Sequence, residues 1–303
     1  LAWLRADNQL AEVRAADLRF TDPEAGQFLN QAMGLSLSPA DVALLEAKTE
    51  GWIAGLQLAA IALQSSLPAQ ERAGRSGWIE TLNGSHRFIL GYLTEQVLDR
   101  QPPEIQQFLL QTSILDRLNG GLCDAVTGRS DGRALLERLV AANLFLVPLD
   151  GRGEWYRYHH LFADLLRAQE QLRPREELPT LHRRASRWYA GAGGERGAFA
   201  SEAVHHALAA QDYATAVELL ERHAVGLVMQ GYVKTVNGWV EAIPAQWRSQ
   251  SPRIHLALAW MHLLRGDYAR ASRYVERLEP VLAEPQDEPC FKDKEPALAG
   301  EWL

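Results

Sequence analysis

Two adjacent histidines, His159 and His160, are the residues of this sequence best suited by type and position to bind an anion. They follow a predicted β-hairpin and precede an apolar stripe of helical period over residues 161–166. A helix N-terminus carries partial positive charge and an imidazole can donate hydrogen bonds, so both would suit a phosphate group. The alternative is that the pair merely caps the hairpin.

The hairpin itself is read from residues 144–158. Residues 144–149 form an apolar, partly β-branched run, residues 150–153 have turn composition, and residues 154–158 resemble a returning strand. Pro148 cannot donate a hydrogen bond to a ladder, so we expect an edge hairpin and not the centre of a large sheet. The rest of the chain has mainly helical patterns.

Other chemistries find little support. The two cysteines, Cys123 and Cys290, are far apart and have no CxxC spacing, which indicates neither a disulfide framework nor a thiolate zinc site. His205 and His206 are adjacent on a predicted helix and would point in different directions, which makes a poor metal pair. Ser85 and Ser113 do not lie in a GxSxG motif, so a hydrolase is not supported.

Composition describes an ordinary globular chain. Its 303 residues predict two or three domains, and 47% apolar with 23% charged residues is typical of a soluble protein. The net charge of −7 argues against a main surface that neutralises phosphates. The scarcity of cysteine suits a reducing cytoplasm, where we expect the protein to be.

The first hundred residues predict a strand over residues 10–20 and then helices. Thr21 and Ser38 each precede a proline and an acidic residue, which are helix start signals. A third helix, apolar almost all round from Trp52 to Leu63, is shorter than the ~18 residues of a membrane span. We therefore expect a buried central helix, followed by a linker over residues 64–77, and no membrane partner.

Three predicted helices, the hairpin and a closing helix outline a winged-helix domain over residues 102–170. This segment has seven arginines and nine acidic residues, a net charge of −2. The helix in the recognition position, residues 131–142, has no Asn, Gln or Lys, whereas groove readers need a basic surface and base-edge donors. We expect this domain to pack internally and not to read DNA.

Beyond residue 174 the sequence predicts helical hairpins with an internal echo. Residues 211–216 (QDYATA) return as residues 266–271 (GDYARA) after 55 residues. A small or polar residue, Asp-Tyr and then Ala is typical of tetratricopeptide-like (TPR-like) repeats, whose small Ala lets paired helices approach and whose curved surface binds partners. The tryptophans of this region are expected mostly in the repeat core: Trp188, Trp239, Trp247 and Trp260.

Six segments carry a family resemblance, in the same order along the chain: residues 14–20 (RAADLRF), 49–59 (TEGWIAGLQLA), 84–88 (GSHRF), 108–115 (FLLQTSIL), 142–149 (ANLFLVPL) and 156–162 (YRYHHLF). Together they resemble the MalT-like, ATP-dependent regulators of the LuxR type. These large bacterial transcription regulators are a branch of the signal-transduction ATPases with numerous domains. The resemblance covers nearly the whole chain.

The resemblance implies a mainly α fold in which the chain is an internal piece of a longer protein. Residues 1–20 would end a nucleotide-binding α/β domain, residues 21–101 would form a helical domain, residues 102–170 the winged helix, and residues 171–303 a truncated TPR-like sensor. The sequence has no GxxxxGK[ST] P-loop, so the chain itself is not expected to be an enzyme that hydrolyses ATP. The P-loop and a DNA-binding helix-turn-helix would lie outside it.

The resemblance also implies a site and partners. His159 matches the histidine of the family's MHD motif, which in relatives reaches the phosphates of ADP, and His160 stands where the motif has Asp. Gly55, Leu56 and Gln57 match the nucleotide-side GxP motif, with Gln in place of Pro. Glycines such as Gly51 and Gly55 are more often needed for close packing. ATP or ADP would be the cofactor of the intact parent. A small-molecule or protein effector would bind the repeats, the missing C-terminal domain would bind promoter DNA, and the protein could self-associate. The competing hypothesis is a TPR-type interaction scaffold without a nucleotide role.

Overall fold

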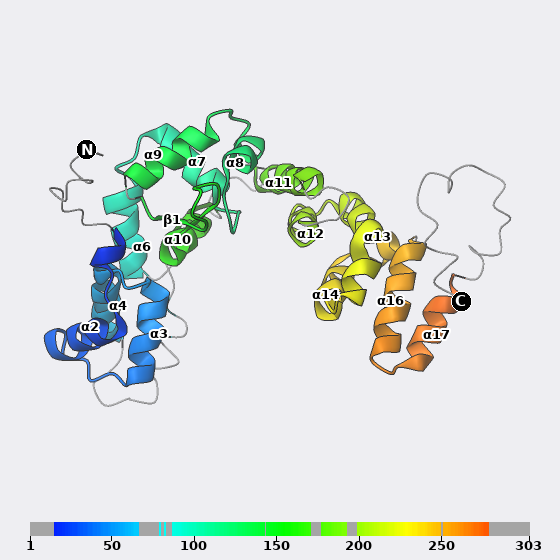
Figure 1. The fold of residues 1–303 in the computed structure, drawn as a ribbon, viewed down its shortest axis with the longest axis horizontal. Coiled ribbons are helices and arrows are strands. Elements are labelled where there is room, and N and C mark those ends of the chain that lie inside the picture. The colour runs from blue at the N-terminus through cyan, green and yellow to red at the C-terminus, as the bar shows by residue number, and fades with distance from the viewer. Residues whose placement is uncertain are drawn as a thin grey trace. The chain divides into compact units, whose positions relative to one another are not determined.

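The computed structural model confirms a mainly α-helical protein with a single antiparallel β-hairpin in the part of the chain that it describes (Figure 1). It describes residues 15–66, 79, 82, 87–142, 144–170, 177–192, 199–249 and 251–278. Contacts divide the chain into two compact units, Leu1–Leu181 and His182–Leu303, which are described separately below.

The first unit begins with helices that start where local signals place them. Its elements are η1 (Ala15–Leu18), α2 (Asp22–Gln27), η2 (Phe28–Ala32), α3 (Pro39–Thr49), α4 (Ile53–Ser66), α6 (Arg87–Leu93) and η3 (Thr94–Leu98). The Glu24 carboxylate accepts a hydrogen bond from the Thr21 amide (2.9 Å), and the Ser38 hydroxyl accepts one from the Asp41 amide (3.2 Å). The strand predicted over residues 10–20 is wrong in its described part, because η1 is a 3₁₀ helix there; residues 10–14 lie outside the described residues.

Helix α4 is the buried centre of this region, as the sequence predicts. Leu56, Ala59, Ala60 and Ala62 are completely buried. Helix α4 also continues to Ser66, so the start of the predicted linker at residue 64 is wrong; residues 67–77 lie outside the described residues. Among the described residues, no helix is both long and apolar enough to cross a membrane.

The predicted order of three helices, a hairpin and a closing helix is present. The elements are α7 (Pro103–Thr112), α8 (Gly120–Thr127), α9 (Gly132–Ala141), β1 (Leu146–Pro148), β2 (Tyr156–Tyr158) and α10 (His160–Glu170). Among the residues that the structure describes, strand β1 pairs only with β2, with Val147 opposite Arg157, whereas β2 also bridges to Leu118. The edge position of Pro148 is therefore confirmed.

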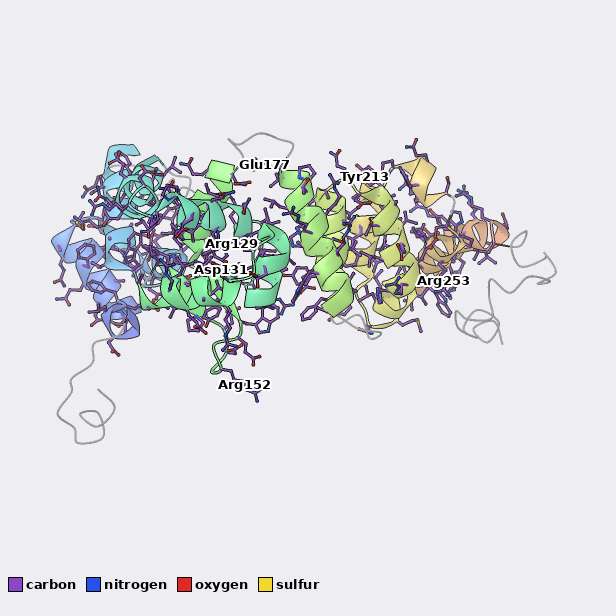
Figure 2. The ribbon with its side chains drawn as sticks, turned by 90° about the horizontal axis from the view of Figure 1, so that it is seen from above. Arg129, Asp131, Arg152, Glu177, Tyr213 and Arg253 are labelled. Atoms are coloured by element: carbon purple, nitrogen blue, oxygen red, sulfur yellow. The ribbon has the colours of Figure 1, made fainter. Side chains whose placement is uncertain are left out.

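Asp150 shapes the turn of the hairpin. Its carboxylate accepts hydrogen bonds from the amides of Arg152 (3.0 Å), Glu154 (3.0 Å) and Trp155 (2.9 Å). These bonds hold the pKa of Asp150 below its usual range. Arg152 lies at the tip of the turn, which extends away from the helices around it (Figure 2).

The second unit is built from helix pairs. Its helices are α11 (Leu178–Ala192), which begins in the first unit, α12 (Ala200–Ala209), α13 (Tyr213–Met229), α14 (Val233–Ala242), α15 (Ala245–Arg248), α16 (Pro252–Leu264) and α17 (Tyr268–Glu276). The sequence echo has a structural counterpart. Asp212 caps α13 by accepting from the Thr215 amide, and Asp267 caps α17 by accepting from the Arg270 amide, both at 3.2 Å. Four residues after each cap, Ala216 and Ala271 are buried, α13 packing with α12 and α17 with α16.

The prediction that the tryptophans form the core of the repeats is wrong. Trp188, Trp239 and Trp260 are only partly buried and Trp247 is 38% exposed. The core consists mostly of smaller side chains, such as Leu219, Leu220, Val236, Ala257 and Met261. Residues 281–303, which include a predicted loop and a further helix, lie outside the described residues.

Candidate functional site

The candidate site is built on the tight turn between α3 and α4. Glu50 ends α3 in the left-handed conformation (φ 52°), and Gly51 follows in the same region (φ 68°). A Cβ on Gly51 would lie 2.5 Å from the carbonyl oxygen of Phe20, so only glycine fits there. This turn directs the Glu50 side chain toward β2 and the start of α10.

Glu50 is the charged centre of the site. Its buried carboxylate, 8% exposed, receives two hydrogen bonds from the guanidinium of Arg157, at 2.7 and 3.0 Å. The amide of His160 donates to the same carboxylate at 3.3 Å, and the His160 Nδ1 atom lies 3.3 Å from it. Arg19 is 3.8 Å away. The anion at the N-terminus of α10 is therefore a carboxylate from the chain itself.

The protonation state of Glu50 follows from these contacts. Burial alone would raise its pKa, but the hydrogen bonds from Arg157 and the His160 amide, together with the charge of a protonated His159 nearby, lower the pKa to about 2. Glu50 is thus ionised at neutral pH. It joins the helical segment before residue 101 to the hairpin and α10.

His159 lies beside this carboxylate but makes its hydrogen bond elsewhere. Its residue is 4% exposed, and its Nε2 atom is 2.9 Å from the carbonyl oxygen of Thr49. The ring meets Trp52 and Phe145 edge-on, with centroids 6.2 and 5.8 Å apart. His159 immediately precedes α10, so the predicted position at the start of this helix is confirmed.

The contact with Thr49 fixes the tautomer of His159. A carbonyl oxygen only accepts, so Nε2 must carry the proton, and in a neutral ring Nδ1 is then an unprotonated acceptor. Nδ1 is buried and has no hydrogen-bond partner in the described part of the chain. Burial lowers the pKa of His159, while Glu50, 4.0 Å from Nε2, opposes that shift. Burial therefore disfavours a second proton on the ring, and negative groups close to the ring favour one.

The other predicted site residues lie around the same turn but differ in exposure. A Cβ on Gly55 would lie 2.6 Å from the Trp52 ring and 3.3 Å from the Thr49 side chain, so Gly55 permits close packing. Leu56 is completely buried in the core. Gln57 is exposed. Gly55 thus reaches His159 only through its neighbours Thr49 and Trp52.

Sequence reasoning missed Glu50 and Arg157, which are 107 positions apart. One local signal was available for Arg157: it alternates with Tyr156 and Tyr158, whose side chains are buried, and must therefore point to the opposite face of the hairpin. Glu50 gave no comparable signal, because a glutamate at a helix end is usually solvated.

A second pairing that the sequence did not predict lies in the second unit. The Nδ1 atoms of His182 on α11 and His206 on α12 are 2.8 Å apart, and the His206 ring stacks on Tyr189 at 7°. One Nδ1 must donate and the other must accept, so the accepting ring is neutral. Burial is the main cause that lowers their pKa values, to about 4 for His182 and about 3 for His206. No group of three residues able to hold a metal ion occurs among the described residues.

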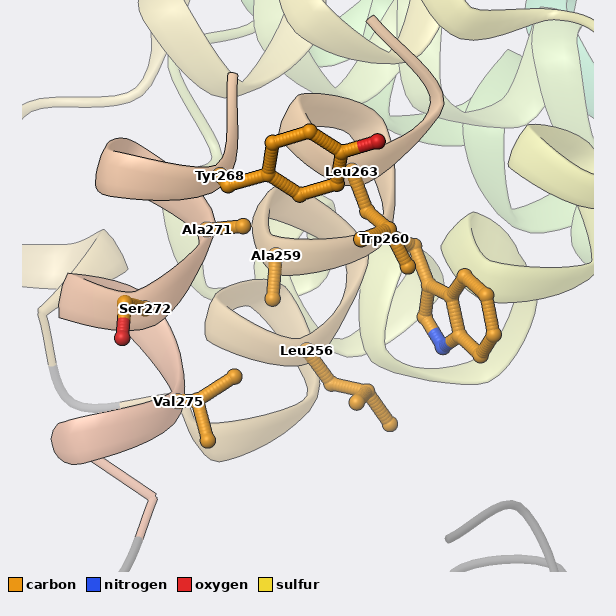
Figure 3. Close-up of a pocket in the computed structure, with 8 residues that line it drawn as sticks. All are labelled: Leu256, Ala259, Trp260, Leu263, Tyr268, Ala271, Ser272 and Val275. Atoms are coloured by element: carbon orange, nitrogen blue, oxygen red, sulfur yellow. The ribbon is translucent and has the colours of Figure 1, made fainter. Parts of the chain in front are cut away.

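Helices α16 and α17 carry two cavities of opposite character. One, of about 350 Å³, has an almost entirely apolar lining: Leu256, Ala259, Trp260, Leu263, Tyr268, Ala271, Ser272 and Val275 (Figure 3). The other, of about 450 Å³, is lined by four arginines and two histidines among other residues of α14, α15, α16 and α17. This second cavity is called the basic cleft below.

The chain is a mainly helical protein with a winged-helix domain and, in its second unit, paired helices. Comparisons with known proteins show which proteins it is similar to. Residues 94–178 match the MalT winged helix domain family. The chain is 38% identical over 279 residues to the serine/threonine-protein kinase PknK of Mycobacterium tuberculosis, covering 92% of this chain and 24% of the kinase. It is 34% identical over 283 residues to the HTH-type transcriptional regulator MalT of Serratia proteamaculans, covering 93% of this chain and 30% of MalT. It is also 34% identical over 288 residues to MalT of a Klebsiella pneumoniae strain, covering 95% of this chain and 31% of MalT.

The resemblance to MalT-like regulators is thereby confirmed over most of the chain. The chain spans about a quarter to a third of the length of these relatives. The matched winged-helix region, residues 94–178, includes Arg157, His159 and all of α10.

Proposed function

We propose that this chain is the regulatory part, combining a switch and an effector sensor, of a MalT-like transcription regulator. One observation carries the proposal. The same stretch is similar both to a protein named as a kinase and to proteins named as transcriptional regulators. A segment shared by proteins with different outputs serves best as the part that controls output. Catalysis and DNA reading are then functions of other parts of those proteins.

The switch would centre on His159 and a bound ADP or ATP in the intact parent. The support for this is that Nδ1 of His159 is buried and has no partner among the described residues, although it donates to an anion only when the ring is doubly protonated. When bound, the nucleotide would supply a phosphate oxygen as acceptor. Donation from Nδ1 requires the doubly protonated ring, with Nε2 still held by Thr49 and with Glu50 nearby as a counter-charge.

Replacement of His159 tests this switch directly. A charge-assisted hydrogen bond contributes roughly 1.5–3 kcal/mol, which is about a tenfold to hundredfold change in affinity. In the full-length parent, His159→Ala should weaken ADP binding by that factor and raise effector-independent transcription. His160→Ala is the matched control, since its side chain is 62% exposed and should matter much less. Unchanged ADP affinity in His159→Ala, or equal effects at both positions, would refute the switch.

Proton uptake provides a second test of the same step. If Nδ1 must be protonated to donate, ADP binding near neutral pH should take up close to one proton. Calorimetry of the parent in buffers with different ionisation enthalpies measures this number. His159→Gln should abolish the uptake and His160→Gln should retain it. Binding without proton uptake would mean that His159 stays neutral and does not contact the phosphate.

The competing function is an interaction scaffold without a nucleotide role. It is favoured by the fact that Glu50, Arg157 and His159 already connect the helical segment to the winged helix without any ligand. In that case His159 only caps the hairpin, and His159→Ala would lower stability without changing nucleotide affinity. Thermal denaturation and ADP titration of the same variant separate the two functions.

The chain alone should neither hydrolyse ATP nor read duplex DNA. Its sequence has no P-loop lysine, and its winged-helix segment has a net charge of −2. In the recognition position, Arg133 is paired with Glu137 at 3.0 Å, and just before this helix Arg129 is held by Asp131 at 2.7 Å. Phosphate release above a buffer blank would contradict the first expectation. A gel shift that survives competitor DNA at physiological salt would contradict the second.

A further inference from the structure

Helix α16 presents two different faces. His255, Leu258, His262 and Arg265 follow one another at steps of three or four residues and line the basic cleft. Leu256, Ala259 and Leu263 have the same spacing on the neighbouring face, and with Trp260 they line the apolar cavity (Figure 3). The cleft side of this helix pair therefore carries Arg265, Arg270 and Arg277.

The basic cleft has a large excess of positive charge. Arg248, Arg265, Arg270 and Arg277 line it, together with one carboxylate, Glu241. The chain as a whole has a net charge of −7, so this concentration of arginine does not follow from composition. Like charges held close together repel one another, and an anion bound between them relieves that repulsion.

Two of the four guanidinium groups are available to a ligand. The side chains of Arg265 and Arg277 have no hydrogen-bond or ion-pair partner in the described part of the chain, although Arg277 lies over the Tyr274 ring at 5.7 Å. Arg248 reaches the Val240 carbonyl at 3.4 Å. Arg270 lies 3.4 Å from Asp267. The planar guanidinium fork matches the oxygens of a phosphate or carboxylate.

Aromatic rings form one side of the same cleft. Tyr274 stacks on His262 at 11°, with centroids 5.6 Å apart, and lies 6.0 Å from the His255 ring. His255 is buried, and burial lowers its pKa, with Arg277 acting in the same direction. This imidazole therefore adds a polar but mainly neutral group, and the arginines supply the charge.

We propose that the basic cleft binds a small anionic ligand that carries a phosphate or carboxylate group. This inference rests on the proposed sensor role and names the chemical class of its effector. A cavity of about 450 Å³ lies within the range of small-molecule sites. It is too small to enclose a nucleic-acid duplex or a folded protein. Arg265 and Arg277 bind the anionic group of the ligand, and Tyr274 contacts the remainder of the ligand.

Asp267 connects the cleft to the helix that carries two of its arginines. Its side chain caps α17 and also lies 3.6 Å from Nδ1 of His262 and 3.4 Å from Arg270. An anion that draws Arg270 toward the cleft competes with Asp267 for the same guanidinium. Ligand binding is thereby coupled to the start of α17.

Titration calorimetry on the 303-residue chain tests the proposal. The probes are ribose 5-phosphate for the phosphate group, citrate for the carboxylate group and ribose as the neutral control. We expect at least one charged probe to bind at millimolar concentration while ribose does not. Arg265→Gln and Arg277→Gln should each weaken that binding about tenfold. Comparison of the affinities for ribose 5-phosphate and citrate then shows whether the cleft prefers a phosphate or a carboxylate group.

Arg273→Gln is the matched control, because Arg273 is exposed on the same helix, α17, but does not line the cleft. It should bind the probe as the unchanged chain does, and circular dichroism should show that all three variants keep their helices. The proposal is overturned if neither charged probe binds, if ribose binds equally well, or if Arg273→Gln loses as much affinity as Arg277→Gln. His159→Ala should leave probe binding unchanged, so failure of the nucleotide switch and failure of the cleft are distinguishable.

Discussion

The two units concentrate charge in opposite ways. Around Glu50 in the first unit, a buried carboxylate is surrounded by Arg157, His159 and His160, and its charge is satisfied within the chain. In the basic cleft of the second unit, Arg265 and Arg277 are exposed and have no carboxylate partner among the described residues. An internally satisfied ionic cluster fixes geometry, whereas an unsatisfied one can respond to a ligand. The difference suits a switch in one unit and a sensor in the other.

The largest effect should come from removing the carboxylate of the first cluster. Glu50→Gln leaves Arg157 without its two charge-assisted hydrogen bonds, and we expect a loss of about 3 kcal/mol in the free energy of unfolding of the first unit. Urea denaturation followed by tryptophan fluorescence measures it. Glu137→Gln removes an exposed carboxylate that also pairs with an arginine, and it should change stability by less than about 0.5 kcal/mol. Similar losses in both variants would mean that Glu50 does not organise the unit.

As the pH falls, the two units should lose stability in different pH ranges. The second unit should begin to lose stability at a higher pH than the first. A histidine whose folded-state pKa is lowered favours folding above its unfolded pKa of about 6.5, and this contribution is lost as pH falls toward the folded value. This stabilisation is lost between pH 6.5 and about pH 4 for His182, and between pH 6.5 and about pH 3 for His206. We expect the second unit to lose about 2 kcal/mol between pH 6.5 and 4. In the first unit, the ionised form of Glu50 stabilises the fold, and this contribution is lost only as the pH falls from about 4.5 to about 2.

Far-UV circular dichroism and urea denaturation across pH 3–7.5 measure this separation. His206→Gln should flatten the loss between pH 6.5 and 4, whereas His205→Gln, at an exposed neighbouring position, should not. If His205→Gln flattens the curve equally, the buried pair is not its cause.

A smaller effect should follow from removing a repeated helix cap. Asp212→Ala leaves the Thr215 amide without its acceptor and should destabilise the second unit by about 1 kcal/mol. Asp212→Asn can still accept this bond and serves as the control. Denaturant midpoints measure both. Equal losses in the two variants would mean that charge, and not capping, is what Asp212 contributes.

These expectations also show what the sequence could reveal. The helix starts at Thr21 and Ser38 were readable because each depends on residues within three positions. The hairpin and His159 at the start of α10 were readable because the hydrophobic period changes there. Pro148 further restricted the hairpin to an edge.

Features that depend on distant residues were not readable. The Glu50–Arg157 pair joins residues 107 positions apart, and the His182–His206 pair forms only when α11 and α12 pack together. The tryptophans were misplaced because their hydrophobicity suggested the core, whereas their size and indole N–H allow partly exposed positions on the repeats. The 3₁₀ turn at Ala15–Leu18 lies in an apolar, alternating stretch that local periodicity assigns to a strand.

The smallest expected effect concerns Arg133 on α9. Its pair with Glu137 is a surface contact between side chains that are 83% and 58% exposed, so Arg133→Gln should change stability by no more than about 0.5 kcal/mol. If α9 read DNA, the same variant would instead reduce salt-dependent binding to duplex DNA. Fluorescence anisotropy with a labelled duplex should show no competitor-resistant binding by the unchanged chain, by Arg133→Gln or by Arg152→Gln at the tip of the hairpin (Figure 2). Competitor-resistant binding that is lost in Arg133→Gln but kept in Arg152→Gln would assign α9 to DNA. It would then place a second, nucleic-acid role in the unit that contains the buried Glu50 carboxylate.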